Sequence, residues 1–139
     1  MTYSDIPFNY AACIQTDCPK ATSCLRAMAY ALTPKEEQYI RVVNPSVVIA
    51  SDNCSFYRDS KPVAFAKGFV KMKDEMLTGQ YSEFTNRMIA HFGRNSYFIR
   101  RRGERLLPKS EQEIILYIIK DIGIEKHLEF DKYIDCLNW

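Results

Sequence analysis

Residues 110–124 read SEQEIILYIIKDIGI, and this stretch decides the fold class. Its isoleucines recur at the spacing of one helical face, at Ile114, Ile115, Ile118, Ile119 and Ile122. Ser110 and Glu113 form a capping box in front of them, and Gly123 is typical of the residue that ends a helix. The stretch therefore predicts an amphipathic helix over residues 110–122 whose isoleucine face lies in the core.

The sequence on either side predicts further helices and a few extended segments. We expect helices after the capping residue Ser23, after the start signal Thr33-Pro34-Lys35-Glu36, over residues 65–77, over residues 82–93 and from about Asp131 onward. We expect a strand at residues 39–43, a turn at 46–50, an extended segment at 62–66 and a hairpin at 97–107. Strand–helix–strand alternation is missing, which favours an α+β fold over a doubly wound sheet.

Length and composition fit one domain. The chain has 139 residues, of which 47% are hydrophobic and 26% charged, an ordinary globular balance. We expect a helix-rich single domain over residues 1–139, with a small antiparallel sheet or hairpin and a four-cysteine site. In this interpretation residues 1–60 carry the cysteines, and residues 61–139 form a helix–hairpin–helix part of the same core.

Two features predict a cytoplasmic protein. No stretch approaches the roughly 18 apolar residues that a membrane helix needs. Residues 1–10 carry acidic Asp5 and polar Ser4 and Asn9 where a signal peptide has lysines and then leucines. Because cytosolic thiols are kept reduced, the five cysteines need an explanation other than disulfides.

Four of the cysteines have a spacing that favours a metal site. Four residues separate Cys13 from Cys18, five separate Cys18 from Cys24, and Cys54 follows after 29 more. Two neighbouring loops and one segment far along the chain can bring four thiolates to one point. Lys20 and Arg26 flank the cysteines in the sequence and would offset the negative charge of the thiolates.

Three interpretations of this cluster stay open. Four-thiolate zinc sites are a common use of cytosolic cysteines. A 4Fe-4S cluster is held by the same ligand set, and a Cys-Pro pair such as Cys18-Pro19 recurs near such clusters. Free cysteines also serve as small buried hydrophobes. We expect zinc at Cys13, Cys18, Cys24 and Cys54, and we assign Cys136 to the core.

These residues also carry a resemblance. The cysteine spacing continues into Cys54-Ser55-Phe56-Tyr57, and further motifs follow at Ala66-Lys67-Gly68-Phe69, His91-Phe92-Gly93-Arg94 and Arg102-Gly103-Glu104-Arg105-Leu106. Together they resemble a domain of unknown function from gut bacteria, a family of small cysteine-containing proteins. The resemblance covers most of the chain. It implies that the four cysteines act as a unit and implies no activity.

A basic segment offers a second candidate site. Residues 94–110 carry six basic side chains against the single acid Glu104, whereas residues 111–139 carry seven acids against three lysines. The arginines of the segment are Arg94, Arg100, Arg101, Arg102 and Arg105. Arginines beside Tyr97 and Phe98 suit phosphate contact and base stacking, which predicts a nucleic-acid or protein partner at this surface. The alternative is that they pair with the acidic C-terminal segment of the same chain.

No catalytic motif is present. The sequence lacks a nucleophile elbow, a phosphate-binding loop, a dinucleotide fingerprint and the HExxH zinc-protease signature. We therefore expect a non-enzymatic, metal-stapled binding or regulatory module. The alternatives are an iron–sulfur or reactive-thiol redox protein, and a nucleic-acid-binding module acting through residues 94–105.

Overall fold

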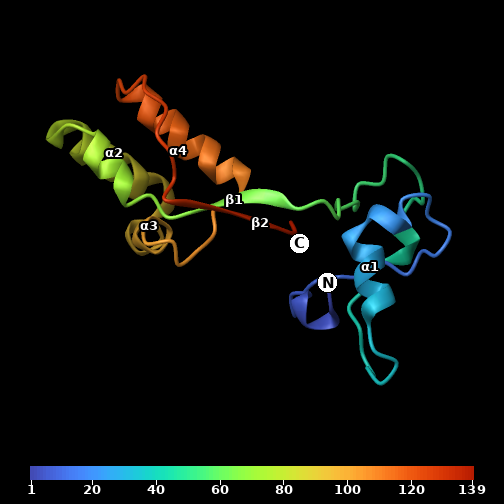
Figure 1. The fold of residues 1–139 in the computed structure, drawn as a ribbon. Coiled ribbons are helices and arrows are strands. Elements are labelled where there is room, and N and C mark those ends of the chain that lie inside the picture. Colours follow the sequence, from blue (N-terminus) through green and yellow to red (C-terminus); the bar gives the residue numbers. More distant parts are fainter. The chain divides into compact units, whose positions relative to one another are not determined.

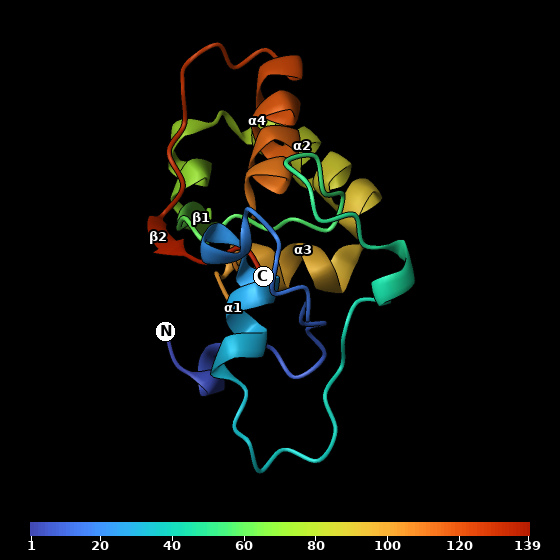
Figure 2. The same cartoon turned by 90° about the vertical axis from the view of Figure 1, so that its right-hand side faces the viewer.

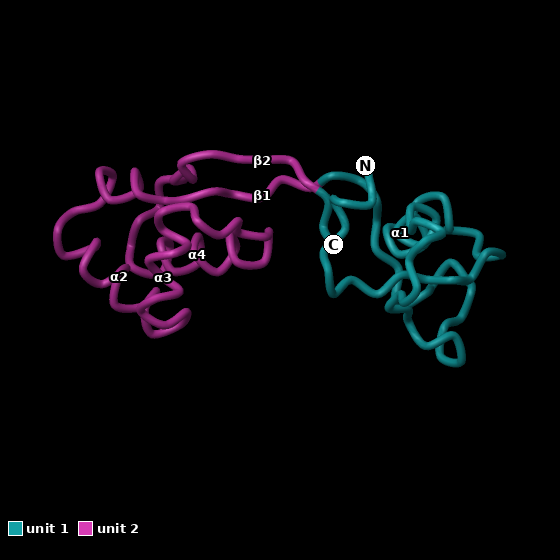
Figure 3. Tube along the Cα trace, turned by 90° about the horizontal axis from the view of Figure 1, so that it is seen from below, with its two compact units in different colours: residues 1–62, 137–139 teal, residues 63–136 magenta.

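A computed structural model describes residues 1–139 and divides them into two compact units. Unit 1 comprises Met1–Pro62 and Leu137–Trp139, and unit 2 comprises Val63–Cys136 (Figure 3). The division lies two residues from the internal boundary predicted at residues 60 and 61. Whether the two units behave as one domain stays a prediction.

The elements make up the α+β fold that the sequence predicts. The α-helices are α1 Leu25–Leu32, α2 Thr78–Phe92, α3 Arg94–Arg101 and α4 Lys109–Asp121, and the strands are β1 Val63–Lys67 and β2 Lys132–Cys136. Four short 3₁₀ helices, η1 Tyr3–Asp5, η2 Ala21–Ser23, η3 Pro45–Val47 and η4 Lys71–Glu75, complete the secondary structure. None of the helices is long and apolar enough to cross a membrane.

Unit 2 contains the hydrophobic core. Strands β1 and β2 pair antiparallel, from Val63 opposite Cys136 to Lys67 opposite Lys132. Helices α2 and α4 lie side by side (Figures 1 and 2), and α4 also packs against β1. Thirteen apolar side chains are buried together: Ala66, Phe69, Met72, Phe84, Met88, Tyr97, Leu107, Ile115, Ile118, Ile119, Ile124, Leu128 and Phe130.

Helix α4 confirms the prediction made from the isoleucine stripe. Ile115, Ile118 and Ile119 are buried, and Ile114 and Ile122 pack against the core. At the C-terminal end the Ile124 amide donates to the Ile119 carbonyl at 3.2 Å, as a Schellman motif requires. The predicted capping box is wrong, because the helix begins at Lys109 with Pro108 at the N-cap.

The predicted hairpin at residues 97–107 is wrong. Arg94–Arg101 form helix α3 instead, and the chain turns at Gly103, whose φ of 72° suits glycine. Tyr97 and Arg100 are three residues apart, so both point from one helical face into the core, where they are 1% and 7% exposed. Of these residues Leu107 alone forms a β-bridge, in which it exchanges two backbone hydrogen bonds with Ala66.

Two predicted helices of unit 2 are wrong as well. The helix predicted at residues 65–77 is β1 followed by the short η4, and the helix predicted from Asp131 is β2. The extended segment predicted at residues 62–66 is confirmed as most of β1. Gly68, with a φ of 76°, interrupts the regular backbone conformation between β1 and η4. The helix predicted at residues 82–93 is confirmed as α2, which begins earlier, at Thr78, and ends at Gly93.

Some of the predictions made for unit 1 are confirmed and others are wrong. Helix α1 is confirmed, although its N-cap is Cys24 and not Ser23. The turn at residues 46–50 is confirmed in part by η3. No helix follows Thr33, and of the strand predicted at residues 39–43 only Val42 forms a bridge, with Ala12.

Unit 1 has almost no hydrophobic core. Its buried apolar residues are Ala12, Cys24, Leu25 and Ala29, against thirteen in unit 2. Backbone hydrogen bonds between loops connect the rest: the Leu25 amide donates to the Arg58 carbonyl at 2.8 Å, and the Ala12 amide to Arg41 at 2.9 Å. Hydrophobic burial therefore contributes little to the stability of unit 1.

Candidate metal centre

The four predicted ligands lie around one small cavity in unit 1. Cys13, Cys18, Cys24 and Cys54 all line it, and its volume is about 20 Å³. That volume corresponds to roughly one water molecule. The remaining lining consists of Gln15, Lys20, Arg26, Ala27, Val48, Phe56 and Tyr57. The sequence predicted the four cysteines as a group, and the fold brings them to a common space.

Local turns and the start of α1 position each cysteine. Cys24 is the N-cap of α1 and forms an isolated bridge with Asp59, which connects α1 to the Cys54 loop. The carbonyls of Cys18 and Cys54 accept turn hydrogen bonds from the amides three residues later, at 3.0 and 3.1 Å. The Cys13 amide donates to the Arg26 carbonyl in α1 at 2.9 Å. All four segments are thereby ordered by backbone contacts.

The side chains are free thiols that do not already form a ligand cluster. Cys24 is 8% exposed, and the other three are half-buried. No group of three or more histidine, cysteine, aspartate or glutamate side chains is arranged to coordinate an ion.

Cys136 lies elsewhere. It ends strand β2 in unit 2, opposite Val63, and does not line the cavity. Burial, with a smaller contribution from the neighbouring Asp135 carboxylate, raises the pKa of its thiol. A raised pKa disfavours the thiolate form that binds metals. The assignment of Cys136 to the core is not confirmed, because the residue is half-buried and lies outside the core cluster.

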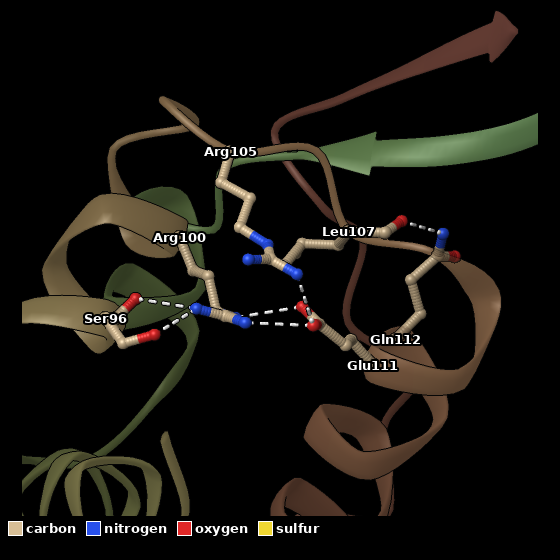
Figure 4. Close-up of polar contacts among 6 residues, drawn as sticks. All are labelled: Ser96, Arg100, Arg105, Leu107, Glu111 and Gln112. Carbon is tan, nitrogen blue, oxygen red and sulfur yellow. Dashed lines mark hydrogen bonds and ion pairs between the residues drawn. The ribbon is translucent and has the colours of Figure 1, made fainter. Parts of the chain in front are cut away.

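The arginine segment does not form one basic surface. Figure 4 shows Arg100 between Ser96 and Glu111, with two bonds of 2.9 Å to the Glu111 carboxylate and one of 3.3 Å to the Ser96 carbonyl. It also contacts the Ser96 hydroxyl and lies 4.6 Å from the centre of the Phe92 ring. Arg100 is thus a buried part of the fold of unit 2.

Of the other four arginines, two form ion pairs with acidic side chains and two do not. Arg105 reaches the same Glu111 carboxylate at 3.4 Å, and Arg102 pairs with Glu104 at 2.5 Å. Arg94 and Arg101 form no ion pair. Contact with nucleic acid or a protein partner stays a prediction.

Two residues of these sites were missed in the sequence. Glu111 was counted only as part of an acidic segment, although its place in the first turn of α4 is typical of an acidic side chain at a helix start. Phe56 was quoted without a role, and its backbone carbonyl accepts a hydrogen bond from Arg26 at 3.0 Å. Spacing alone cannot indicate a backbone acceptor 30 residues away.

A family of unknown function, DUF6078, matches residues 1–139. No curated protein and no solved structure shows significant similarity. The bacterial origin and cytoplasmic location expected from the sequence stay predictions. Because the match extends over the whole chain, the protein belongs to the DUF6078 family.

Proposed function

We propose that Cys13, Cys18, Cys24 and Cys54 bind one zinc ion, which stabilises unit 1 as a non-enzymatic binding or regulatory module. The observation that carries the proposal is the single small cavity that all four cysteines line. They come from separate segments up to 41 positions apart, so a common location is not a consequence of sequence proximity. Four thiolates are the ligand set of many structural zinc sites.

The small core of unit 1 supplies the energetic reason. Unit 1 has 65 residues, 62 plus 3, and Leu25 is its only large aliphatic side chain among the buried residues. Domains of about 60 residues are marginally stable even with an ordinary core, and smaller cores usually need a metal or disulfides. A structural zinc ion contributes about 10–16 kcal/mol of binding free energy near neutral pH, and that energy becomes folding energy.

Elemental analysis of freshly purified full-length protein, together with an absorption spectrum, tests the proposal. We expect one zinc per chain, zinc–sulfur distances of about 2.3 Å by X-ray absorption, and no visible colour. Serine at any one of the four positions should lower the zinc content. Cys136→Ser is the matched control and should leave it unchanged. Iron and sulfide in a brown sample would establish the cluster alternative, and metal-free protein whose stability is unaffected by chelators would refute both.

A further inference from the structure

Lys20 connects two of the cysteine segments. Its ammonium group donates to the Asp52 carbonyl at 2.6 Å and lies 4.8 Å from the centre of the Tyr57 ring. Lys20 follows Cys18 by two residues, and Asp52 precedes Cys54 by two. Lys20 is also one of the residues that line the cysteine cavity.

Arg26 connects the other segments through a fork. In the first turn of α1, it donates from Nη1 to the Ala11 carbonyl at 2.6 Å and from Nε to the Phe56 carbonyl at 3.0 Å. Its guanidinium lies 4.8 Å from the centre of the Tyr10 ring. Arg26 follows Cys24 by two residues, Ala11 precedes Cys13 by two, and Phe56 follows Cys54 by two.

The two side chains share one arrangement. Each cationic residue follows one cysteine by two positions, and its side chain donates to a backbone carbonyl two positions from another cysteine. Together the two side chains connect all four cysteine segments. We propose that Lys20 and Arg26 are positioning residues of the metal centre, which hold its four segments in place and make it selective for a divalent ion. This inference rests on the proposed function.

Charge balance identifies the class of ion. Four thiolates carry −4, Lys20 and Arg26 carry +2, and a divalent ion adds +2, so the loaded site is neutral. A monovalent ion would leave an uncompensated negative charge in a half-buried site, which is energetically unfavourable. The Tyr10 and Tyr57 rings keep the two cations at the site after desolvation, because the face of an aromatic ring attracts a cation.

Titration with Co²⁺, followed by competition with Zn²⁺, tests the inference on the full chain. Cobalt bound to thiolates absorbs in the near ultraviolet and visible range, so the spectra report both affinity and the electronic state of the ligands. We expect Arg26→Gln and Lys20→Gln each to weaken binding by about 10–100-fold, the usual effect of losing an outer-sphere partner. Both should also shift the sulfur-to-cobalt absorption, since each removes a cationic residue from the lining of the cavity.

Conservative and control variants separate charge from geometry. Arg26→Lys retains the charge but cannot contact two carbonyls in one plane, so its affinity should fall between those of the wild type and Arg26→Gln. If Arg26→Gln leaves unit 1 unfolded, Arg26→Lys is used in its place. Arg58→Gln is the matched control: Arg58 follows Cys54 by four residues, is exposed, donates only to the adjacent Tyr57 carbonyl and does not line the cavity.

The outcomes distinguish this inference from the proposed function. If the wild type fails to bind Co²⁺ at one ion per chain, the metal centre itself is refuted. If the wild type binds but Arg26→Gln and Lys20→Gln match Arg58→Gln in affinity and spectrum, the positioning role is refuted and the metal centre stands.

Discussion

Replacing Arg100 by alanine should destabilise unit 2 strongly. The Arg100 side chain is 8% exposed and the Glu111 side chain 15%, and two bonds of 2.9 Å join them. Removing one partner of a buried ion pair leaves a charge without compensation, which costs about 3–5 kcal/mol. Arg105 retains a contact of 3.4 Å to Glu111, but this contact is too long and too exposed to replace the two hydrogen bonds that Arg100 makes to the carboxylate.

The same carboxylate provides the control. Arg105 contacts Glu111 with a side chain that is 57% exposed, so Arg105→Ala should cost only about 0–1 kcal/mol. Urea denaturation followed by circular dichroism measures both values, because α2, α3 and α4 contribute most of the helical signal. Equal losses of stability for the two variants, or a loss under about 1 kcal/mol for Arg100→Ala, would refute the assignment of Arg100 to the fold.

Three further predictions concern packing and backbone. Ile118→Ala should cost about 2–5 kcal/mol in the same assay, because Ile118 is 5% exposed in the core, whereas alanine at the 64% exposed Tyr117 should cost little. Gly68→Ala should destabilise more than Gly123→Ala: both glycines have positive φ, but only at Gly68 would the new methyl group lie 2.8 Å from a side-chain oxygen, that of Asp131. Cys136→Ser should lower the thermal midpoint without changing zinc content, and a loss of zinc in this variant would place Cys136 among the ligands.

Helix α4 could be predicted because its signals are local. Each part of the pattern, the isoleucine spacing and the terminating glycine, lies within fifteen residues, and helical hydrogen bonds connect residues four apart. The N-terminal end was predicted less well, since the N-cap residue is Pro108 and not Ser110.

Strands β1 and β2 could not be predicted in the same way. Their partners lie 65 to 73 positions apart, and each strand exists because the other is present. Taken alone, residues 65–77 show a helical spacing of apolar side chains, but residues 65–67 pair with β2 instead. The hairpin predicted at residues 97–107 failed because Arg102-Gly103 was taken as a hairpin turn, whereas Gly103 follows the C-terminal end of helix α3.

Residue type and short spacing are enough to predict the α+β composition and the isoleucine-rich helix, and they predict the four cysteines as a group. The roles of the charged side chains follow from the tertiary structure alone. It directed Arg100 into the core onto Glu111 and turned Lys20 and Arg26 toward carbonyls of distant loops. A charged side chain takes its role from the nearest acceptor and the local burial, and both depend on contacts between segments far apart in the chain.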